Sequence, residues 1–386
     1  MYLKKRIIIL LLMLALGLGL AFYAYQNKDF IMHRQASFLE LRDWKNQNFV
    51  DLKLTFINNC KQGERFYRHK QLNDKFGSKE QWAKFCEGLP KLSNNNDEIR
   101  KYFEQLTVLE IFQPFESKSL FTGYYSPMLH GSFTKTEEYN YPLRKRPVDL
   151  VDIHLKDFMD DAKYKYKKIF GVVDGNRLRP YYTRKQIDNE NVLNDDNVIV
   201  WVNDKVDAFF LHIQGSGEVK IDATGQVIKV GYAGQNGHAY YAIGRYMVKK
   251  GMLKKEEVSL QSIRKYLEEN PEQVDEILHQ NPSYIFFAER KDGPFGAFGN
   301  VLTPNHSVAT DRNFVPLGTP LFIDTTVTAT GEDFHKMVFA QDVGGAIKGA
   351  IRADIFFGSD DQAEYNSGKQ NQEGNLYVLS AKDIEL

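Results

Sequence analysis

The chain has 386 residues, which is enough for two ordinary domains and an additional terminal segment. Lysine plus arginine and aspartate plus glutamate number 50 each, so no overall charge favours nucleic acid or an anionic surface as a partner. The nine histidines include no His-x-x-x-His or His-x-x-Glu-His spacing, so the sequence predicts neither a metal centre nor a cofactor.

Residues 1–26 form the clearest targeting signal. Lys4, Lys5 and Arg6 precede an uncharged apolar run from Ile7 to about Tyr25, a pattern typical of an export signal or an N-terminal membrane anchor. The segment contains no cysteine, which excludes anchoring by a lipidated cysteine. We therefore expect the rest of the chain in the cell envelope, on the periplasmic side. The sequence does not decide whether the segment is cleaved.

Residues 26–115 are predicted to be mainly helical. Ser78 and Gln81 have the spacing of a capping box in front of Trp82. Apolar residues then recur at three and four positions, on one helix face: Ile99, Tyr102, Phe103 and Leu106. Cys60 and Cys86 are the only cysteines, and an oxidising compartment would allow a disulfide between them, but both states stay open.

From residue 120 short strands follow one another, separated by Gly, Pro, Asn and Asp. We predict strands at 198–202 and 208–213 and a hairpin that pairs 219–221 with 227–230. Apolar residues at helical intervals predict a helix after residue 238 and another at 260–267, and a further strand is predicted at 284–287. This order of helices, strands, helices and strands indicates one β-domain that is split by an inserted one.

The stretch 339–358 is the strongest candidate for chemistry. It places Asp342 and Asp354 at the two ends of a run interrupted by glycines, and Asp354 lies among apolar residues. Burial raises the pKa of a carboxyl group, so such an acid can carry a proton near neutral pH. The structural alternative is that both aspartates only cap backbone amides at a turn. A serine nucleophile at Ser216 lacks the Gly-x-Ser-x-Gly spacing, and both cysteines lie in the helical N-terminal part.

Carboxylate chemistry outside the cytoplasm suggests cleavage of a glycan. The 21 tyrosines and 27 phenylalanines fit either a β-rich core or a groove whose rings stack on sugars. Glycosidases ordinarily use two carboxylates, but the second is dispensable when the substrate supplies its own nucleophile.

Six segments resemble the membrane-bound lytic murein transglycosylase A family and occur in the same order. They are FTGYYSP at 121–127, IQGSG at 213–217, GYAGQNGH at 231–238, NPSYIFF at 281–287, ATDRNFVPLGTP at 309–320 and AQDVGGAIKG at 340–349. The last two also resemble the family's C-terminal module named for three aspartates, here Asp311, Asp342 and Asp354. The resemblance implies a mainly β fold with N-terminal helices. A double-psi β-barrel (27–125 plus 287–386) would be split by an inserted second β-domain (126–286), with the substrate groove between them.

The resemblance also implies the reaction. Asp354 corresponds to the family's single catalytic acid, so we expect a peptidoglycan lytic exotransglycosylase, a lyase that cleaves the MurNAc–GlcNAc bond and leaves 1,6-anhydromuramoyl ends. The sequence itself does not separate terminal from internal cleavage. The alternatives are a hydrolytic muramidase, which needs a second carboxylate, and a non-catalytic wall-binding or wall-loosening module.

Further residues receive weaker roles from the same resemblance. Asp342 and Asp311 would order the loop around Asp354, and Lys348 would contact a substrate oxygen. The groove would be lined from the other side by Tyr124, Tyr125, Gln214, Ser216, Tyr232, Asn236 and His238. For His238, capping of the following helix is an equal alternative. Expected partners are peptidoglycan strands and the membrane through an uncleaved N-terminal segment, with envelope proteins as further candidates, but no nucleic acid.

Overall fold

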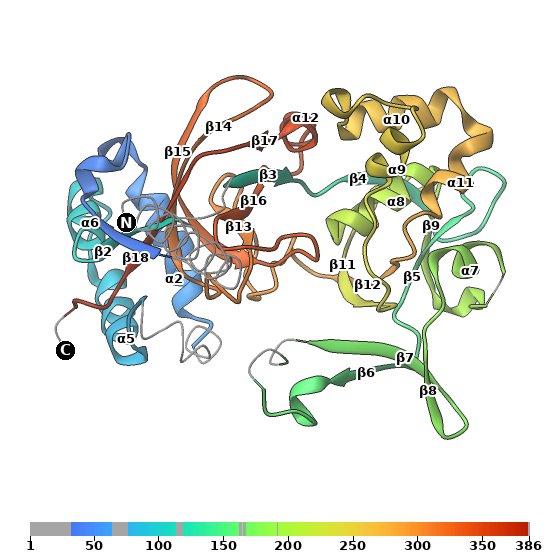
Figure 1. Cartoon of the computed structure of the whole chain (residues 1–386), viewed down its shortest axis with the longest axis horizontal. Coiled ribbons are helices and arrows are strands. Elements are labelled where there is room, and N and C mark those ends of the chain that lie inside the picture. The colour runs from blue at the N-terminus through green and yellow to red at the C-terminus, as the bar shows by residue number, and fades with distance from the viewer. Residues whose placement is uncertain are drawn as a thin grey trace, which may run out of the picture.

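The computed structural model describes residues 32–63, 76–112, 119–161, 164, 167–190 and 192–384. The predicted export or anchor segment, residues 1–26, lies outside these ranges. Among the residues within them, no helix has the length and apolar character needed to cross a bilayer. The described chain is mainly β with helices at its N-terminal end, as the sequence predicts, and its strands form three sheets (Figure 1).

The first sheet combines strands from both ends of the chain. Its order is β1-β2-β18-β14-β15-β13-β16-β3-β17, so β1 and β17 lie at its two edges and the described strands do not close into a ring. The strands are β1 (Met32–Ala36), β2 (Thr107–Phe112), β3 (Leu120–Tyr124), β13 (Ser307–Thr310), β14 (Pro320–Thr326), β15 (Asp333–Asp342), β16 (Arg352–Phe356), β17 (Asn371–Gln372) and β18 (Asn375–Ser380). The double-psi barrel therefore stays a prediction.

The other two sheets are built from the middle of the chain. The second has the order β12-β11-β10-β4-β9-β5, and the third is the antiparallel arm β6-β7-β8, which projects from the body in Figure 1. Their strands are β4 (Met128–Ser132), β5 (Tyr141–Arg144), β6 (Leu150–His154), β7 (Lys168–Asp174), β8 (Arg177–Pro180), β9 (Val198–Val202), β10 (Ser216–Ile221), β11 (Val227–Gln235) and β12 (Ile285–Arg290). The predicted strand 198–202 and the predicted hairpin, now β10 and β11, are confirmed.

The helices fall into two groups that follow the sheets. Those beside the first sheet are α2 (Phe49–Cys60), α5 (Lys79–Gly88), α6 (Asn96–Phe103) and α12 (Asp361–Lys369), and those beside the second are α7 (Arg184–Asn189), α8 (Lys205–Gln214), α9 (Ile243–Lys249), α10 (Leu260–Glu269) and α11 (Val274–Leu278). Short 3-10 helices are η1 (Phe38–Glu40), η2 (Trp44–Asn46), η3 (Leu89–Lys91), η4 (Leu155–Asp157), η6 (Asp195–Asn197), η7 (Lys255–Glu257) and η8 (Pro271–Gln273). The two groups touch where Gln261 on α10 donates its side-chain amide to the carbonyl of Glu364 on α12, at 3.4 Å.

The N-terminal helices cover one face of the first sheet with an aromatic core. Helix α5 begins with the predicted capping box, in which the side chains of Ser78 and Gln81 each accept the other residue's backbone N–H. On α6, Ile99 and Phe103 are fully buried against the sheet. A disulfide joins Cys60 at the end of α2 to Cys86 on α5, with the two Cα atoms 5.6 Å apart, and so settles the question that the sequence leaves open.

The predicted strand 208–213 is wrong, because these residues belong to helix α8. Its N-cap Asp204 accepts a hydrogen bond from the backbone N–H of Asp207, and Gly215 ends it with φ = 80°. The helix is buried on two sides: Phe209 contacts the helical cluster of α9 to α11, and Leu211 contacts the second sheet. A helix apolar on both sides shows no amphipathic pattern, and a short apolar run then looks like a strand.

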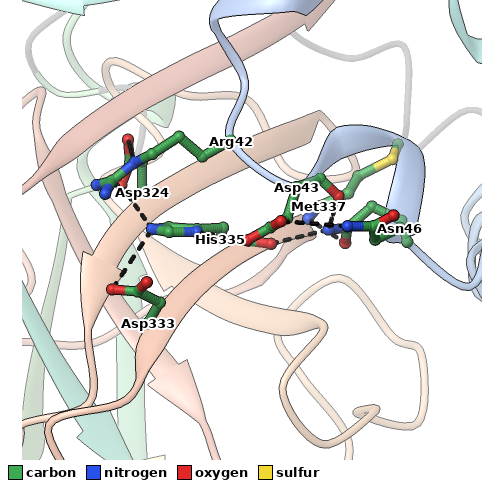
Figure 2. Close-up of polar contacts among 8 residues, drawn as sticks. Arg42, Asp43, Asn46, Asp324, Asp333, His335 and Met337 are labelled. Carbon is green, nitrogen blue, oxygen red and sulfur yellow. Dashed lines mark hydrogen bonds and ion pairs between the residues drawn. The ribbon is translucent and has the colours of Figure 1, made fainter.

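A cluster around His335 fastens the N-terminal segment to the first sheet (Figure 2). The buried imidazole of His335 on β15 places Nδ1 2.9 Å from a carboxylate oxygen of Asp43. Its Nε2 lies 3.3 Å from Asp324 on β14 and 3.8 Å from Asp333. Arg42 donates Nε–H to Asp324 at 3.0 Å. Arg42 and the imidazole thus lie among three carboxylates, of which Asp43 belongs to the N-terminal segment and Asp324 and Asp333 belong to the first sheet.

Candidate active site

Asp354 lies in the middle of β16, between two neighbours that are fully buried, Ala353 and Ile355. Strand β16 pairs in parallel with β3, which places Thr122 directly opposite Asp354. The hydroxyl of Thr122 donates to Oδ1 of Asp354. Burial raises the pKa of Asp354, while this hydrogen bond and then the positive charge of Arg352 act in the opposite direction. The carboxyl group of Asp354 is therefore desolvated, and one hydrogen bond, from Thr122, stabilises its ionised form.

Asp342 ends β15 and is held by three donors. Its Oδ1 accepts the backbone N–H of Ala297 at 2.8 Å and that of Val343 at 2.9 Å, and its Oδ2 accepts the hydroxyl of Tyr124 at 3.1 Å. Burial nevertheless raises the pKa of Asp342 to about 6, and the charge of Asp354 adds to this increase. The hydrogen bonds fix the orientation of the Asp342 carboxylate and favour its ionised form.

Tyr124 links the two acids electrostatically. Its ring packs on Phe356 of β16 with centroids 5.2 Å apart, and its side chain is buried. Burial raises the pKa of the Tyr124 phenol, and the charges of Asp342 and Asp354 raise it further. Two interacting carboxyls lose their protons as a pair. Asp342 accepts three hydrogen bonds and Asp354 one, so the carboxylate of Asp342 is fixed more firmly than that of Asp354.

Asp311 organises the loop between β15 and β16. Its Oδ1 accepts both the backbone N–H and the side-chain amide of Asn313, at 3.0 and 2.8 Å. Its Oδ2 accepts the backbone N–H of Gly349 at 3.1 Å, and Gly349 has φ = 113°, which favours glycine. Lys348 precedes this glycine and is exposed. The three aspartates singled out in the sequence thus share one end of the first sheet and its adjoining loop.

The segment that leaves β3 docks on the start of the second sheet. The backbone N–H of Tyr125 donates to Oε1 of Gln214 at the end of α8, at 3.2 Å. A Cβ on Gly217 would lie 2.7 Å from the carbonyl oxygen of Pro127, so only glycine fits there. The sequence segments 121–127 and 213–217 therefore meet in space. Ser216 opens β10 opposite Gly231, and the Tyr125 side chain is buried.

The remaining predicted residues lie on the second sheet and its loops. Asn236 is buried and uses its side chain fully. Its amide donates to the carbonyls of Tyr182 and Pro282, both at 2.8 Å, and its oxygen accepts the backbone N–H of Tyr284 at 2.9 Å and that of His238 at 3.3 Å. No donor or acceptor of the Asn236 side chain remains for a ligand, so it acts on the loop's conformation.

His238 and Tyr232 differ from Asn236 in their exposure. His238 donates Nε2–H to the carbonyl of Tyr181 at 2.7 Å, and helix α9 has Ala242 as its N-cap, so the predicted capping alternative is wrong. Tyr232 on β11 is 47% exposed. Its ring is thus available to a ligand in a way that the Asn236 side chain is not.

Two residues that sequence reasoning missed complete the surroundings of Asp354. Thr122 lies inside the segment 121–127, and Arg352 lies two positions before Asp354 on the same face of β16. The only sequence signal for Arg352 was its spacing of two positions from Asp354, which places both side chains on one face of a strand. Within the described ranges, no three His, Cys, Asp or Glu side chains are grouped closely enough to bind a metal ion.

Family models match two regions of the chain. Residues 120–288 match the MltA specific insert domain, and residues 306–380 match the 3D domain. The first match spans the second and third sheets together with β3, and the second contains the three aspartates and β13 to β18.

Comparison with known proteins gives the same family. The membrane-bound lytic murein transglycosylase A of Escherichia coli K12 is 32% identical over 266 residues, which cover 67% of this chain and 65% of that protein. The chain thus spans just under two thirds of the length of this relative.

Solved structures align over more of the chain. A crystal structure of MltA from Neisseria gonorrhoeae is 32% identical with a TM-score of 0.76, and the alignment covers 92% of this chain and 94% of that one. The structure of E. coli MltA with bound chitohexaose is 25% identical with a TM-score of 0.65, with 86% and 90% covered. The identity and coverage of the Neisseria structure show that this chain belongs to the membrane-bound lytic murein transglycosylase A (MltA) family.

Proposed function

We propose that the protein is a lytic transglycosylase that cleaves the β-1,4 bond between MurNAc and GlcNAc in peptidoglycan. The single observation that carries this proposal is the pair of coupled carboxyls, in which Asp354 is desolvated and Asp342 is held by three hydrogen bonds. Family membership and the chitohexaose bound by E. coli MltA support a glycan as the substrate.

In the proposed reaction Asp354 acts first as an acid and then as a base. Its protonated carboxyl donates a proton to the glycosidic oxygen, and the bond from C1 to that oxygen breaks with its electron pair moving to the oxygen. The 6-hydroxyl oxygen of the same muramoyl residue then bonds to C1, and the hydroxyl proton passes to the Asp354 carboxylate. The product has a 1,6-anhydromuramoyl end, no water is consumed, and Asp354 is protonated again. An intramolecular nucleophile can replace several kcal/mol of activation entropy.

The hydrogen bonds of Asp342 favour this reaction over hydrolysis. An inverting muramidase needs a second carboxylate that activates water, and a retaining one needs a carboxylate that attacks the sugar. Both oxygens of Asp342 already accept hydrogen bonds from Ala297, Val343 and Tyr124. Asp342 is therefore better suited to tune and orient the site than to attack.

Supporting roles follow from the contacts around the pair. Asp311 holds Gly349 and so the loop that carries Lys348, which we propose to contact a substrate oxygen. On the second sheet we propose that Tyr232 stacks on sugar rings and that His238 and Ser216 contact the glycan. Gln214, Asn236, Tyr124 and Tyr125 then act mainly by fixing backbone and carboxylate positions.

The finer architecture is part of the proposal. We infer that residues 27–125 and 287–386 form a double-psi β-barrel, that residues 126–286 form the insert, and that the glycan lies between them. The switch from the first to the second sheet between Tyr124 and Met128 supports the first boundary. The chain returns to the first sheet at β13, and β12 still pairs in the second sheet up to Arg290, which favours a second boundary after residue 290. The enzyme would act on periplasmic peptidoglycan, with residues 1–26 as its export signal or anchor.

Incubation of the purified protein with peptidoglycan, followed by mass spectrometry of the new ends, tests the proposal. Anhydromuramoyl ends are expected from the wild type and none from Asp354→Asn, which should still bind glycan. Reducing muramoyl ends, heavier by one water, would identify a muramidase. Glycan binding without any shortening by the wild type would identify a wall-binding module.

A further inference from the structure

The side chains of Arg352, Thr122 and Asp354 form a chain of hydrogen bonds on one face of the first sheet. Arg352 donates Nη2–H to Oγ1 of Thr122 at 2.8 Å, and Thr122 donates its hydroxyl hydrogen to Oδ1 of Asp354. Arg352 and Asp354 are two positions apart on β16, and Thr122 faces Asp354 from β3. The order is therefore guanidinium, hydroxyl, carboxyl.

The guanidinium itself is held by the backbone. Its Nη1 donates to the carbonyl oxygens of Leu120 at 3.1 Å and Ala353 at 2.6 Å, one on each of the two paired strands. These contacts fix the plane of the Arg352 fork, so the Nη2–H that reaches Thr122 is fixed as well. A lysine has neither this plane nor this number of donors in fixed directions.

Counting hydrogens gives the direction of the Thr122 hydroxyl. A guanidinium in a protein only donates, so the oxygen of Thr122 must be the acceptor in its contact with Arg352. The hydroxyl has a single hydrogen, and that hydrogen is then directed to Oδ1 of Asp354. Protonation of Oδ1 would bring a second hydrogen between the same two oxygens.

We propose that Arg352, acting through the hydroxyl of Thr122, is a positioning residue that reserves Oδ1 of Asp354 as an acceptor and leaves Oδ2 to carry the transferred proton. This inference rests on the proposed role of Asp354 as the acid. Under this inference, Oδ2 of Asp354 faces the glycosidic bond, and Arg352 and Thr122 determine that it is Oδ2 and not Oδ1.

The same contacts affect the acidity of Asp354. The Thr122 hydrogen bond and the Arg352 charge stabilise the carboxylate and limit the increase in the pKa of Asp354 that burial causes. The other titratable groups around it are Tyr124 on β3 and Asp342 at the end of β15. Removing the Thr122 hydroxyl must therefore move the deprotonation of Asp354 to higher pH.

The experiment measures kcat and KM against pH on soluble, peptide-free glycan strands for the wild type, Thr122→Val and Thr122→Ser. Valine keeps the shape of threonine without the hydroxyl, and serine keeps the hydroxyl. For Thr122→Val we expect the alkaline limb of the kcat profile to move up by about one pH unit, the size of one lost hydrogen bond to a charged group, with KM nearly unchanged. Thr122→Ser should keep the wild-type limb. A Thr122→Val enzyme with an unshifted limb would overturn the inference.

A double-mutant cycle tests the route through Thr122. Arg352→Lys keeps the positive charge but not the fixed fork, and alone it should shift the limb in the same direction by a smaller amount. Added to Thr122→Val it should cause no further shift, because the hydroxyl that it orients is already gone. Shifts that simply add would contradict the inference. Asp354→Asn separates the two claims: if it retains turnover, the proposed function fails, whereas unshifted profiles with an inactive Asp354→Asn enzyme reject only the role of Arg352 and Thr122.

Discussion

The hydroxyl of Tyr124 donates to Oδ2 of Asp342 across 3.1 Å, and this contact joins the first sheet's β3 to the end of β15. Tyr124 is thus a donor to one carboxyl of the pair and a ring neighbour of the strand that carries the other. Its removal should change the protonation of both acids.

Tyr124→Phe leaves Asp342 with two donors instead of three, so the pKa of Asp342 should rise above about 6. A neutral Asp342 no longer opposes the ionisation of Asp354, so less of the acid form is available at neutral pH. We expect the rate to fall roughly fivefold, in line with one hydrogen bond. Tyr246→Phe is the control, because that hydroxyl contacts Glu276 in the helical cluster. Equal rates for wild type and Tyr124→Phe would contradict the coupling.

Asp311→Asn should impair the loop that carries Lys348. The new amide would place a donor toward either the Gly349 N–H or the Asn313 N–H, and a buried donor without a partner costs about 1–3 kcal/mol. We expect faster proteolysis within residues 343–351 and a rate reduced at least tenfold, while Asp292→Asn, at an exposed site, has no effect. Normal loop protection in Asp311→Asn would reject this role.

Some residues of the candidate site could be predicted from the sequence and others could not. Asp342 and Asp354 were identifiable because a run interrupted by glycines and an apolar strand surround them, whereas Asp311 was identified only by the resemblance to the family's C-terminal module. Thr122 and Arg352 were not, because Thr122 reaches Asp354 only through the parallel pairing of β3 and β16, which lie more than 200 residues apart. Sequence spacing carries no information about such a contact.

Helix α8 illustrates a different limit. Its apolar residues face both a sheet and a helical cluster, so the period of 3.6 residues is hidden in the run from Ala208 to Ile213. The signals that could have identified it are at its ends, with Asp204 as the N-cap and Gly215 after the last turn. Local patterns at the β10–β11 hairpin and at the α5 cap were sufficient because both are determined by a few adjacent residues.

The disulfide between Cys60 and Cys86 should stabilise the N-terminal helices. It closes a loop with a sequence separation of 26, for which chain entropy gives about 3.5 kcal/mol. The double variant Cys60→Ser, Cys86→Ser should unfold at a lower urea concentration than the oxidised wild type and match the reduced wild type. Turnover of the folded enzyme should stay unchanged, because both cysteines lie away from Asp354 in the N-terminal helices. Equal urea midpoints for oxidised and reduced wild type would contradict the prediction.

The cluster in Figure 2 should make stability depend on pH through Asp43. The hydrogen bond from His335 lowers the pKa of Asp43 below its ordinary value of 3.8. A carboxylate with a lowered pKa stabilises the fold above its unfolded pKa and loses that contribution as pH falls through the folded value. Asp43→Asn should therefore lower the urea midpoint at pH 7 and have no effect near pH 2. Asp333→Asn, whose carboxylate lies 3.8 Å from the imidazole, should show a smaller difference. A pH-independent effect of Asp43→Asn would contradict this origin.

Digestion of peptidoglycan in water enriched in ¹⁸O tests the central claim most directly, because it asks where the oxygen at each new end comes from. If Asp354 passes its proton to the leaving oxygen and the muramoyl 6-hydroxyl attacks C1, every new end retains the substrate's own oxygen. Mass spectrometry should then find anhydromuramoyl ends without label. Ends that carry one ¹⁸O atom would show that water is the nucleophile and would contradict the account.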